Sequence, residues 1–208
     1  MAFSSCLPFP RKRNKKNPET IKTCKLLVVG DKDSGKTSLI FRFSRDRLPS
    51  DFERRVSVLD TDCMDVIRNG EQIHLYIYDT PGDNDYAKCR ALFYNQVDGI
   101  IICLSLDSPE SLRHVELEWG PEIRHLCHNK PFFLVGTKKD LRDNVTSRLS
   151  SYESLSMPRF VTKKQGKQMA KSIGATAYLE CTTLDSNRKG KDVKRVFGRA
   201  VREFLKRH

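Results

Sequence analysis

The sequence lacks any apolar run that approaches the roughly 20 residues needed to cross a bilayer. Its N-terminus also lacks the apolar region of a secretory signal peptide. The seven cysteines are an odd number without CxxC or CxxH spacing, and several lie in apolar runs, where a reduced cysteine packs as a small hydrophobe. We therefore expect a protein of a reducing, intracellular compartment that is neither secreted by that route nor integral to a membrane.

Positive charge is placed unevenly along the 208 residues, which fit a single domain. The chain has 38 basic and 26 acidic residues, a net charge of +12. Residues 1–25 hold seven basic residues and one acidic residue, residues 186–208 hold nine and two, and the part between them is nearly neutral. The basic segments lack the interleaved aromatic residues that stack on bases, so we expect an anionic membrane surface as their partner and do not expect nucleic acid.

The organisation of the chain changes after residue 22. Residues 1–22 combine three prolines with the basic run 11–16 and show no period that could bury one face, which predicts a disordered tail. Over 23–206, short apolar runs alternate with segments of helical period, which predicts an α/β domain with a mostly parallel sheet and helices on both faces. The expected strands are 25–30, 73–78, 99–106, 131–136 and 176–181, with an antiparallel strand at 56–67, and the expected helices are 36–44, 86–94, 109–127, 163–173 and 193–205.

A glycine-rich loop follows the first expected strand and opens the first expected helix. Its residues, Gly30-Asp-Lys-Asp-Ser-Gly35-Lys36-Thr37, match the pattern GxxxxGK[ST]. In this context the backbone N–H groups wrap the α- and β-phosphates of a nucleotide, Lys36 reaches the β- and γ-phosphates, and the Thr37 hydroxyl binds Mg²⁺. The loop therefore predicts a nucleotide site, against the alternative of a glycine-rich turn without a ligand.

Two further loops stand at the ends of later strands. Asp79-Thr80-Pro81-Gly82 follows the strand at 73–78, where the carboxylate can hold Mg²⁺ through water and the Gly82 N–H can sense a γ-phosphate. Thr137-Lys138-Lys139-Asp140 ends the strand at 131–136. Asp140 can accept from guanine N1–H and the exocyclic amine together, a pattern that adenine does not supply, while the Lys138 stem packs along the base. The three loops, in this order, predict a guanine nucleotide.

These residues give the chain a resemblance to the Ras-type small GTPases, with Leu48-Pro49 similar to the start of the first switch and Glu180-Cys181-Thr182-Thr183 similar to the fifth guanine-contacting loop. Within that superfamily the chain resembles the Rho branch. The grounds are threonine at 137 where Ras proteins have asparagine, the motifs at 141–143 and 165–175, and a surplus stretch at 143–160 that matches the Rho insert, expected as a short exposed helix. The resemblance implies the three-layer, Ras-like P-loop NTPase fold with a six-stranded, mostly parallel sheet.

The resemblance also implies roles for individual residues. The expected contacts to guanine nucleotide, GTP or GDP, are Lys32, Asp33, Ser34, Gly35, Lys36, Thr37, Ser38, Leu48, Gly82, Thr137, Lys138, Asp140, Cys181, Thr182 and Thr183, and the expected Mg²⁺ ligands are Thr37, Ser57 and Asp79. Effector proteins are expected to bind the switch regions 48–62 and 79–94. We expect a monomeric switch in intracellular signalling, with actin cytoskeleton and cell morphology as the pathway that the resemblance implies.

The departures from the family concern hydrolysis. A usual Rho protein has glycine at the position of Lys32 and glutamine at that of Asp83; the glutamine orients the attacking water, and the glycine leaves room for that water and for an arginine finger. Asp83 cannot donate a hydrogen bond to the γ-phosphate, and Lys32 projects into the space of the finger. Pro81, where alanine is usual, stiffens the second switch. We therefore assign no catalytic residue, and the combination resembles the GTPase-deficient Rnd-type members.

The first switch and the end of the chain depart as well. Ser57 falls where Rho proteins have a Mg²⁺-binding threonine, and serine keeps the hydroxyl. Leu48 stands where a phenylalanine usually crosses the guanine face, which predicts weaker stacking and faster nucleotide exchange. Rho proteins usually end in a CaaX prenylation signal, whereas this sequence ends with residues 207–208 after the domain and has no cysteine beyond Cys181. We therefore expect no prenylation.

Attachment to a membrane is then expected to come from the N-terminal tail. Cys6 beside the basic run 11–16 can carry a palmitoyl chain next to a polybasic patch, two signals that together give stable anchoring. A solvated tail with a free cysteine is the alternative. The expected location is cytoplasmic, with peripheral association at the cytosolic face of the plasma membrane or an endomembrane.

Several functions stay open from the sequence. We expect a GTP-loaded signalling protein that hydrolyses GTP very slowly. The alternative is a pseudo-GTPase scaffold with weak or no nucleotide binding, which Leu48, Lys32 and Pro81 favour, while nucleic-acid binding rests on charge alone. A further possibility has Lys32 serving as a finger in cis, paired with Asp83 in the resting state.

Overall fold

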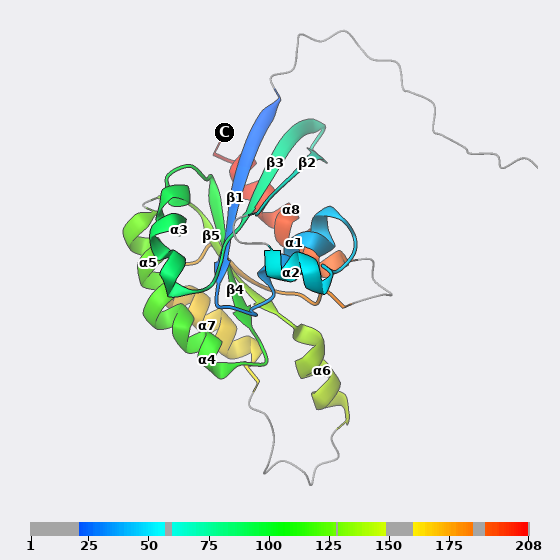
Figure 1. Cartoon of the computed structure of the whole chain (residues 1–208), viewed down its shortest axis with the longest axis vertical. Coiled ribbons are helices and arrows are strands. Elements are labelled where there is room, and N and C mark those ends of the chain that lie inside the picture. Colours follow the sequence, from blue (N-terminus) through cyan, green and yellow to red (C-terminus); the bar gives the residue numbers. More distant parts are fainter. Residues whose placement is uncertain (1–20, 57–59, 128, 149–159, 185–189, 208) are drawn as a thin grey trace, which may run out of the picture.

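The computed structural model describes residues 21–56, 60–127, 129–148, 160–184 and 190–207. Figure 1 shows a twisted sheet with helices on both of its faces. The strands are β1 (Lys22–Gly30), β2 (Asp60–Arg68), β3 (Glu71–Asp79), β4 (Gly99–Ser105), β5 (Phe132–Thr137) and β6 (Ala177–Glu180). The helices are α1 (Lys36–Ser44), α2 (Asp51–Val56), α3 (Ala87–Tyr94), α4 (Pro109–His114), α5 (Gly120–Leu126), α6 (Lys139–Arg148), α7 (Lys163–Ile173) and α8 (Lys191–Leu205), with a 3₁₀ turn η1 (Asn84–Tyr86) and a π-helical turn η2 (Val115–Trp119).

The six strands lie in the order β2-β3-β1-β4-β5-β6. β2 is antiparallel to β3, and the other neighbouring strands are parallel. Asn69 and Gly70 connect β2 to β3 with φ values of +53° and +83°, as a tight two-residue hairpin requires. The parallel strands end at one edge of the sheet, so the loops after β1, β3 and β5 come together there. The predicted α/β fold is confirmed.

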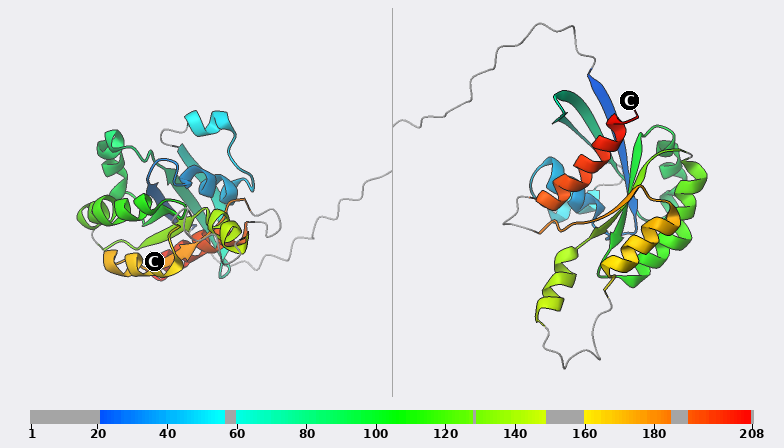
Figure 2. Two further views of the ribbon diagram at one scale, coloured as in Figure 1. Left: turned by 90° about the horizontal axis from the view of Figure 1, so that it is seen from below. Right: turned by 180° about the vertical axis from the view of Figure 1, so that it is seen from behind.

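Alternate side chains along each central strand enter two separate apolar layers. On β1, Leu26 and Val28 pack with α1 and α8, whereas Leu27 and Val29 pack with α3, α7 and the continuous helical segment α4–η2–α5. Figure 2 shows these two helical layers on opposite faces of the sheet. All residues of β4 are buried, because both faces of the strand are covered.

Several elements differ from the sequence-based expectation. Val56, which we placed in a strand, is the last residue of α2, and β2 begins at Asp60. The expected helix at 109–127 contains the wider turn η2, and β1 begins at Lys22, the last residue that we assigned to the tail. We expected a short helix within the insert at 143–160. The structure has a longer helix, α6, which begins before the insert at Lys139 and ends within it at Arg148. Residues 149–159 of the insert lie outside the described residues.

A capping box explains why α2 forms where a strand was expected. Ser50 N donates to Glu53 Oε2 at 2.8 Å, and Glu53 N donates back to Ser50 Oγ at 3.3 Å. Arg47 adds a bidentate contact to the Glu53 carboxylate, at 2.6 and 2.8 Å. These contacts hold the N-terminus of α2 and lower the pKa of Glu53, chiefly through the hydrogen bond from Arg47.

The cysteines of the described part of the chain are free thiols, four of them buried and two, Cys63 and Cys89, exposed. Among the helices of the described residues, none has the length and apolar character of a membrane span. Cys6 and the basic run 11–16 lie outside the described residues.

Candidate functional site

The loop between β1 and α1 bends through conformations that favour glycine. Gly30 has φ +136°, and an added Cβ there would lie 2.4 Å from the carbonyl oxygen of Cys103. Gly35 precedes α1 with φ +88°, and no described side chain caps this helix. The loop can therefore lie close to β4, and the N-terminus of α1 keeps its backbone N–H groups available for an anion.

The Lys36 side chain lies inside this loop. Its Nζ donates to the carbonyl oxygens of Gly30 at 2.9 Å and Asp31 at 2.6 Å. Burial lowers the pKa of Lys36 from its ordinary value, although nearby acidic groups partly oppose this. A bound polyphosphate would favour the charged amine, so the geometry suits a lysine that meets phosphate oxygens.

Two predicted Mg²⁺ ligands lie in contact with each other. Thr37 Oγ1 donates to Asp79 Oδ2 at 2.5 Å. The other carboxylate oxygen, Asp79 Oδ1, is buried and has no hydrogen-bond partner among the described residues, and burial raises the pKa of Asp79 to about 6. A hydroxyl beside an unsatisfied carboxylate oxygen fits Mg²⁺, which would supply positive charge next to the phosphates. Ser57, the third predicted ligand, lies outside the described residues.

The loop after β3 lies directly on the phosphate loop. A Cβ added to Gly82 would lie 2.3 Å from Lys32 N and 2.6 Å from Gly30 O, so only glycine fits. Thr80 Oγ1 fixes the start of this loop by donating to Val28 O of β1 at 2.8 Å. The Gly82 backbone therefore stands at the end of the site where we predicted a contact to the γ-phosphate.

The loops that we predicted to contact guanine are joined to one another by buried hydrogen bonds. Thr137 Oγ1 donates to Ser34 O at 2.6 Å and thereby ties the loop after β5 to the phosphate loop. Asp140 Oδ1 accepts from Thr182 Oγ1 at 2.5 Å. The thiol of Cys181 is buried in the core. The Cys181 N–H donates to Gly136 O of β5 at 2.8 Å and so ties the loop after β6 to β5. The loops after β5 and β6 therefore form one unit around Asp140.

The Lys138 side chain is held at its charged end, where Nζ lies 3.2 Å from Asp107 Oδ2. The Lys138 backbone is in the left-handed region, with φ +53°. Ser105 Oγ donates to the same carboxylate at 2.5 Å. Partial burial raises the pKa of Asp107, but the hydrogen bonds from Ser105 and Lys138 outweigh this and lower it overall. The aliphatic stem of Lys138 is thereby stretched along the site, where a base could lie on it.

A cavity of about 360 Å³ joins the phosphate loop to the guanine loops. It is lined by Asp33, Gly35, Lys36, Thr37, Ser38, Leu48, Thr137, Lys138, Thr183 and Leu184. All of these except Leu184 were predicted from the sequence as nucleotide contacts. The other predicted contacts are in the surrounding loops without lining the cavity: Lys32, Ser34, Gly82, Asp140, Cys181 and Thr182.

Sequence reasoning missed Leu184 because it lies one residue beyond the motif at 180–183. Its side chain is 61% exposed, and its N–H donates to Thr182 Oγ1 at 3.1 Å. A large apolar residue next to a polar binding loop was the available signal, since exposed leucines at such positions can cover a base.

Lys32 and Asp83, the two positions that depart from the family, are both exposed. Within the described part of the chain no ion pair joins them, so the resting pair of the Lys32 alternative is not present in this structure. The backbone around Asp83 is nevertheless held. Arg90, which is fully buried, donates from Nη1 to Pro81 O at 3.1 Å and to Asp83 O at 3.0 Å, and its Nε and Nη2 each lie 3.2 Å from Glu122.

The comparison with known families agrees with this geometry. The model of the Ras family matches residues 25–206, most of the chain and all of the loops described above. Members of that family bind guanine nucleotide and typically Mg²⁺, the ligands that the buried lysine, the unsatisfied carboxylate oxygen and the cavity fit. The chain therefore belongs to the Ras family of small GTP-binding switch proteins.

Proposed function

We propose that this protein is a Rho-type switch that stays loaded with GTP because it hydrolyses the nucleotide very slowly. The observation that carries the proposal is the pair of substitutions at the phosphate end. Asp83 occupies the position that orients water, and its carboxylate accepts hydrogen bonds but donates none to a γ-phosphate. Lys32 occupies the space that an arginine finger needs. Such losses remove on the order of 10³ to 10⁵ in rate.

The contacts of Arg90 support this proposal. Because the guanidinium holds the carbonyls of Pro81 and Asp83, the second switch has limited freedom to bring another group to the attacking water. Pro81 restricts the backbone further, since its ring fixes φ and removes an N–H group. The backbone of the second switch is thus held in place, while the carboxylate at position 83 cannot donate the hydrogen bond that a glutamine would.

The Rho assignment within the Ras family is supported by the position of α6. This helix begins at Lys139, directly after the Thr137–Lys138 pair, and runs to Arg148, inside the stretch 143–160 that resembles the Rho insert. Effectors are proposed to bind the switch regions, where Phe52 on α2 and Leu92 on α3 are exposed. Signalling to the actin cytoskeleton belongs to the same proposal and rests on the resemblance alone.

Single-turnover hydrolysis of GTP tests the proposal. Purified full-length protein is loaded with GTP, and phosphate release is followed with and without the catalytic domain of a Rho GTPase-activating protein. We expect a slow rate that the activating protein leaves unchanged. A stimulated rate equal to that of an active Rho protein measured in parallel would overturn the proposal.

The pseudo-GTPase alternative is favoured by Leu48, which lines the cavity where a ring usually covers the base. The two functions differ in nucleotide content. Denaturing the purified protein and identifying the released nucleotide by chromatography separates them: about one guanine nucleotide per chain supports the switch, and none supports the scaffold.

We further propose that the protein associates peripherally with the anionic cytosolic face of a membrane, through the basic tail and α8. The exposed residues of α8 include Lys191, Lys194 and Arg202, whereas its two acidic residues are half-buried, Asp192 beside Lys139 and Glu203 beside Lys206. Each basic side chain near an anionic bilayer contributes about 1 kcal/mol. Acylation of Cys6 would add a second signal.

Sedimentation with phosphatidylserine vesicles tests this attachment. Lys191→Gln, Lys194→Gln and Arg202→Gln together should reduce binding at physiological salt on the order of 10-fold or more. The matched control replaces three exposed lysines of α7, Lys163, Lys164 and Lys167, by glutamine. Equal losses in the two variants would contradict a specific part for α8, and unchanged membrane fractionation of Cys6→Ser in cells would contradict acylation.

A further inference from the structure

His114, the last residue of α4, has a carboxylate at each of its ring nitrogens. Nδ1 lies 3.1 Å from Asp31 Oδ2, and Nε2 lies 3.3 Å from Glu110 Oε1. A neutral imidazole carries only one N–H and can satisfy only one of these contacts. The protonated ring donates from Nδ1 to Asp31 and places its positive charge beside Glu110, so the arrangement favours the charged form.

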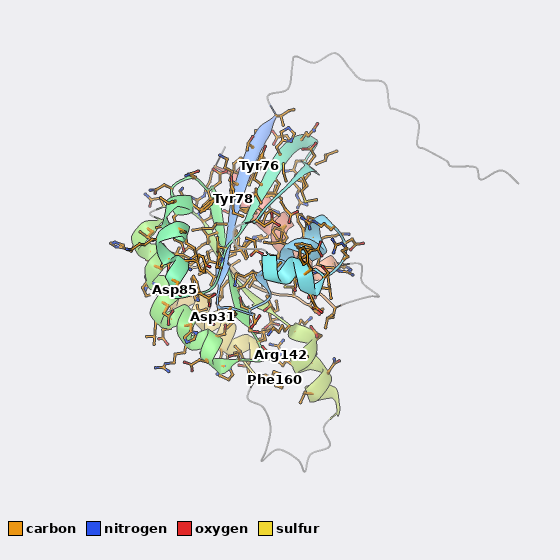
Figure 3. The ribbon with its side chains drawn as sticks, in the orientation of Figure 1. Asp31, Tyr76, Tyr78, Asp85, Arg142 and Phe160 are labelled. Atoms are coloured by element: carbon orange, nitrogen blue, oxygen red, sulfur yellow. The ribbon has the colours of Figure 1, made fainter. Side chains whose placement is uncertain are left out.

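Asp31 connects this histidine to the phosphate loop. Its second carboxylate oxygen, Oδ1, accepts from Trp119 Nε1 at 2.7 Å, and its backbone carbonyl accepts from Lys36 Nζ at 2.6 Å. The same carbonyl accepts from Ser34 N at 3.2 Å. Figure 3 labels Asp31 at the end of β1, beside the helical segment α4–η2–α5. One residue therefore contacts both the nucleotide lysine and the helix that carries His114.

The turn η2 brings Trp119 to this contact. Its five residues form a π-helical turn, in which one more residue per turn is accommodated than in an α-helix. Trp119 is almost fully buried, and its ring lies under the Arg90 guanidinium, 4.7 Å from the ring centroid to Cζ. Because Arg90 also holds the carbonyls of the second switch, the indole contacts both Asp31 of the phosphate loop and the side chain that fixes the second switch.

The charges around His114 come from each element that packs on it. Asp31 of the phosphate loop, Glu110 of α4 and Glu118 of η2 favour the imidazolium, while Arg113, which pairs with Glu110 at 3.1 Å, opposes it. Partial burial lowers the pKa of His114, but the hydrogen bond and charge of Asp31 and the two glutamates outweigh this and raise it above its ordinary value of 6.5. These contacts therefore favour the protonated ring more than water favours a free histidine.

We propose that protonation of His114 strengthens nucleotide binding through Asp31, which makes this protein a pH-dependent GTP-binding switch. The protonated ring compensates the Asp31 carboxylate, a negative charge that stands on the loop expected to hold polyphosphate. When the ring loses its proton, the negative charge of that carboxylate on the phosphate loop is no longer compensated by His114. Nucleotide then dissociates faster. This inference rests on nucleotide binding and is independent of how slowly GTP is hydrolysed.

The expected size follows from one unit of charge. For an assumed separation on the order of 10 Å and an effective dielectric constant between about 40 and 80, a unit charge changes an equilibrium about two- to fourfold. The dissociation rate of nucleotide from the wild-type protein is therefore expected to rise by this factor between pH 6 and pH 8.5, with a midpoint at the pKa of His114.

The experiment measures release of a fluorescent GDP analogue from the full chain over this pH range. His114→Asn keeps an N–H donor toward Asp31 without a titrating charge, and we expect it to abolish the rise. Glu110→Gln removes one of the two carboxylates, and we expect it to move the midpoint to lower pH. The matched control is His125→Asn, an exposed histidine on α5, which should keep the wild-type profile.

A wild-type rate that does not change with pH would overturn the inference, as would a His114→Asn profile that matches the wild type. If His114→Asn fails to fold, the pKa of His114 is measured directly by NMR titration of the wild-type protein loaded with GDP. A value below 6.5 would contradict the paired-carboxylate geometry, and a value above it, with release following the same curve, supports the inference. Loss of nucleotide binding at every pH would instead count against the proposed switch itself.

Discussion

The guanine end and the phosphate end of the cavity are built in contrasting ways. At the guanine end, Thr182 donates to Asp140, and Thr137 donates to Ser34 O of the phosphate loop, so short hydrogen bonds join loops at the carboxyl edge of the sheet. At the phosphate end the backbone is just as firmly held, but Lys32 and Asp83 project from it without an ion pair to each other in the described part of the chain. The loop backbones are therefore held at both ends, and Lys32 and Asp83, which depart from the family at the phosphate end, are exposed side chains.

In the proposed function, binding and hydrolysis depend on separable parts of this fold. Nucleotide affinity is assigned to loop backbones and buried polar groups, which also stabilise the domain. Hydrolysis is assigned to the groups at positions 32 and 83, whose side chains are exposed here, so they can change without loss of the fold.

The largest expected effect restores the missing hydrolytic groups. Lys32→Gly with Asp83→Gln should raise single-turnover hydrolysis in the presence of a Rho GTPase-activating protein on the order of 10³-fold, because water positioning and access for an arginine finger return together. The exposed Asp85 of η1, changed to glutamine, serves as control. If the double variant gains no rate, the slow hydrolysis has a cause other than the side chains at 32 and 83. Slower hydrolysis by Lys32→Gly alone would show that Lys32 acts as a finger in cis.

At the guanine end, Asp140→Ala should weaken GTP binding on the order of 100-fold or more. Two charge-assisted hydrogen bonds to the base are lost, each contributing about 1.5 to 3 kcal/mol. Titration calorimetry measures the change, with Asp143→Ala on the exposed side of α6 as control. An unchanged affinity would mean that this carboxylate does not read the base.

The link between the ends is tested by Thr137→Val, which keeps the shape of the side chain and removes its hydroxyl. Two carbonyl oxygens, of Ser34 and Leu104, lose their donor, and the free energy of unfolding should fall by about 1 to 3 kcal/mol. Urea denaturation of the nucleotide-free protein measures it. A matching loss in Thr183→Val would show that the effect is not specific to the link.

The smallest expected effect concerns the cover of the base. Leu48→Phe should slow nucleotide release roughly two- to tenfold, since an aromatic ring stacks on a base more strongly than an aliphatic side chain. Stopped-flow release of a fluorescent GDP analogue measures it, with Leu184→Phe as the companion variant on the opposite loop. Release that is already slow in the wild type would contradict our prediction for Leu48.

The sequence was sufficient for the parts of the site that are local in the chain. The loop at 30–37 and the motifs after β3 and β5 each pair a strand end with fixed side-chain chemistry, so their position followed from the pattern. The helix α2 differs from the strand predicted at 56–67, although Ser50 and Glu53 have the capping-box spacing that favours a helix before this strand.

Contacts between distant segments could not be predicted. His114 and Trp119 meet Asp31 across more than 80 positions, and Arg90 meets Glu122 across 32. Such pairs depend on the register of packed helices, which a single sequence does not specify. The ion pair of Lys138 with Asp107 was missed for the same reason.

The π-helical turn at Val115–Trp119 makes the length of this helix matter more than the identity of its outer residues. Glu116, Leu117 and Glu118 are exposed, so substitution there should be well tolerated. One further residue inserted between His114 and Trp119 would exceed what the wide turn absorbs and would rotate the helix on one side of it by about 100° relative to the other side. The indole of Trp119 and the ring of His114 could then no longer reach Asp31 together, and the phosphate loop would lose their support.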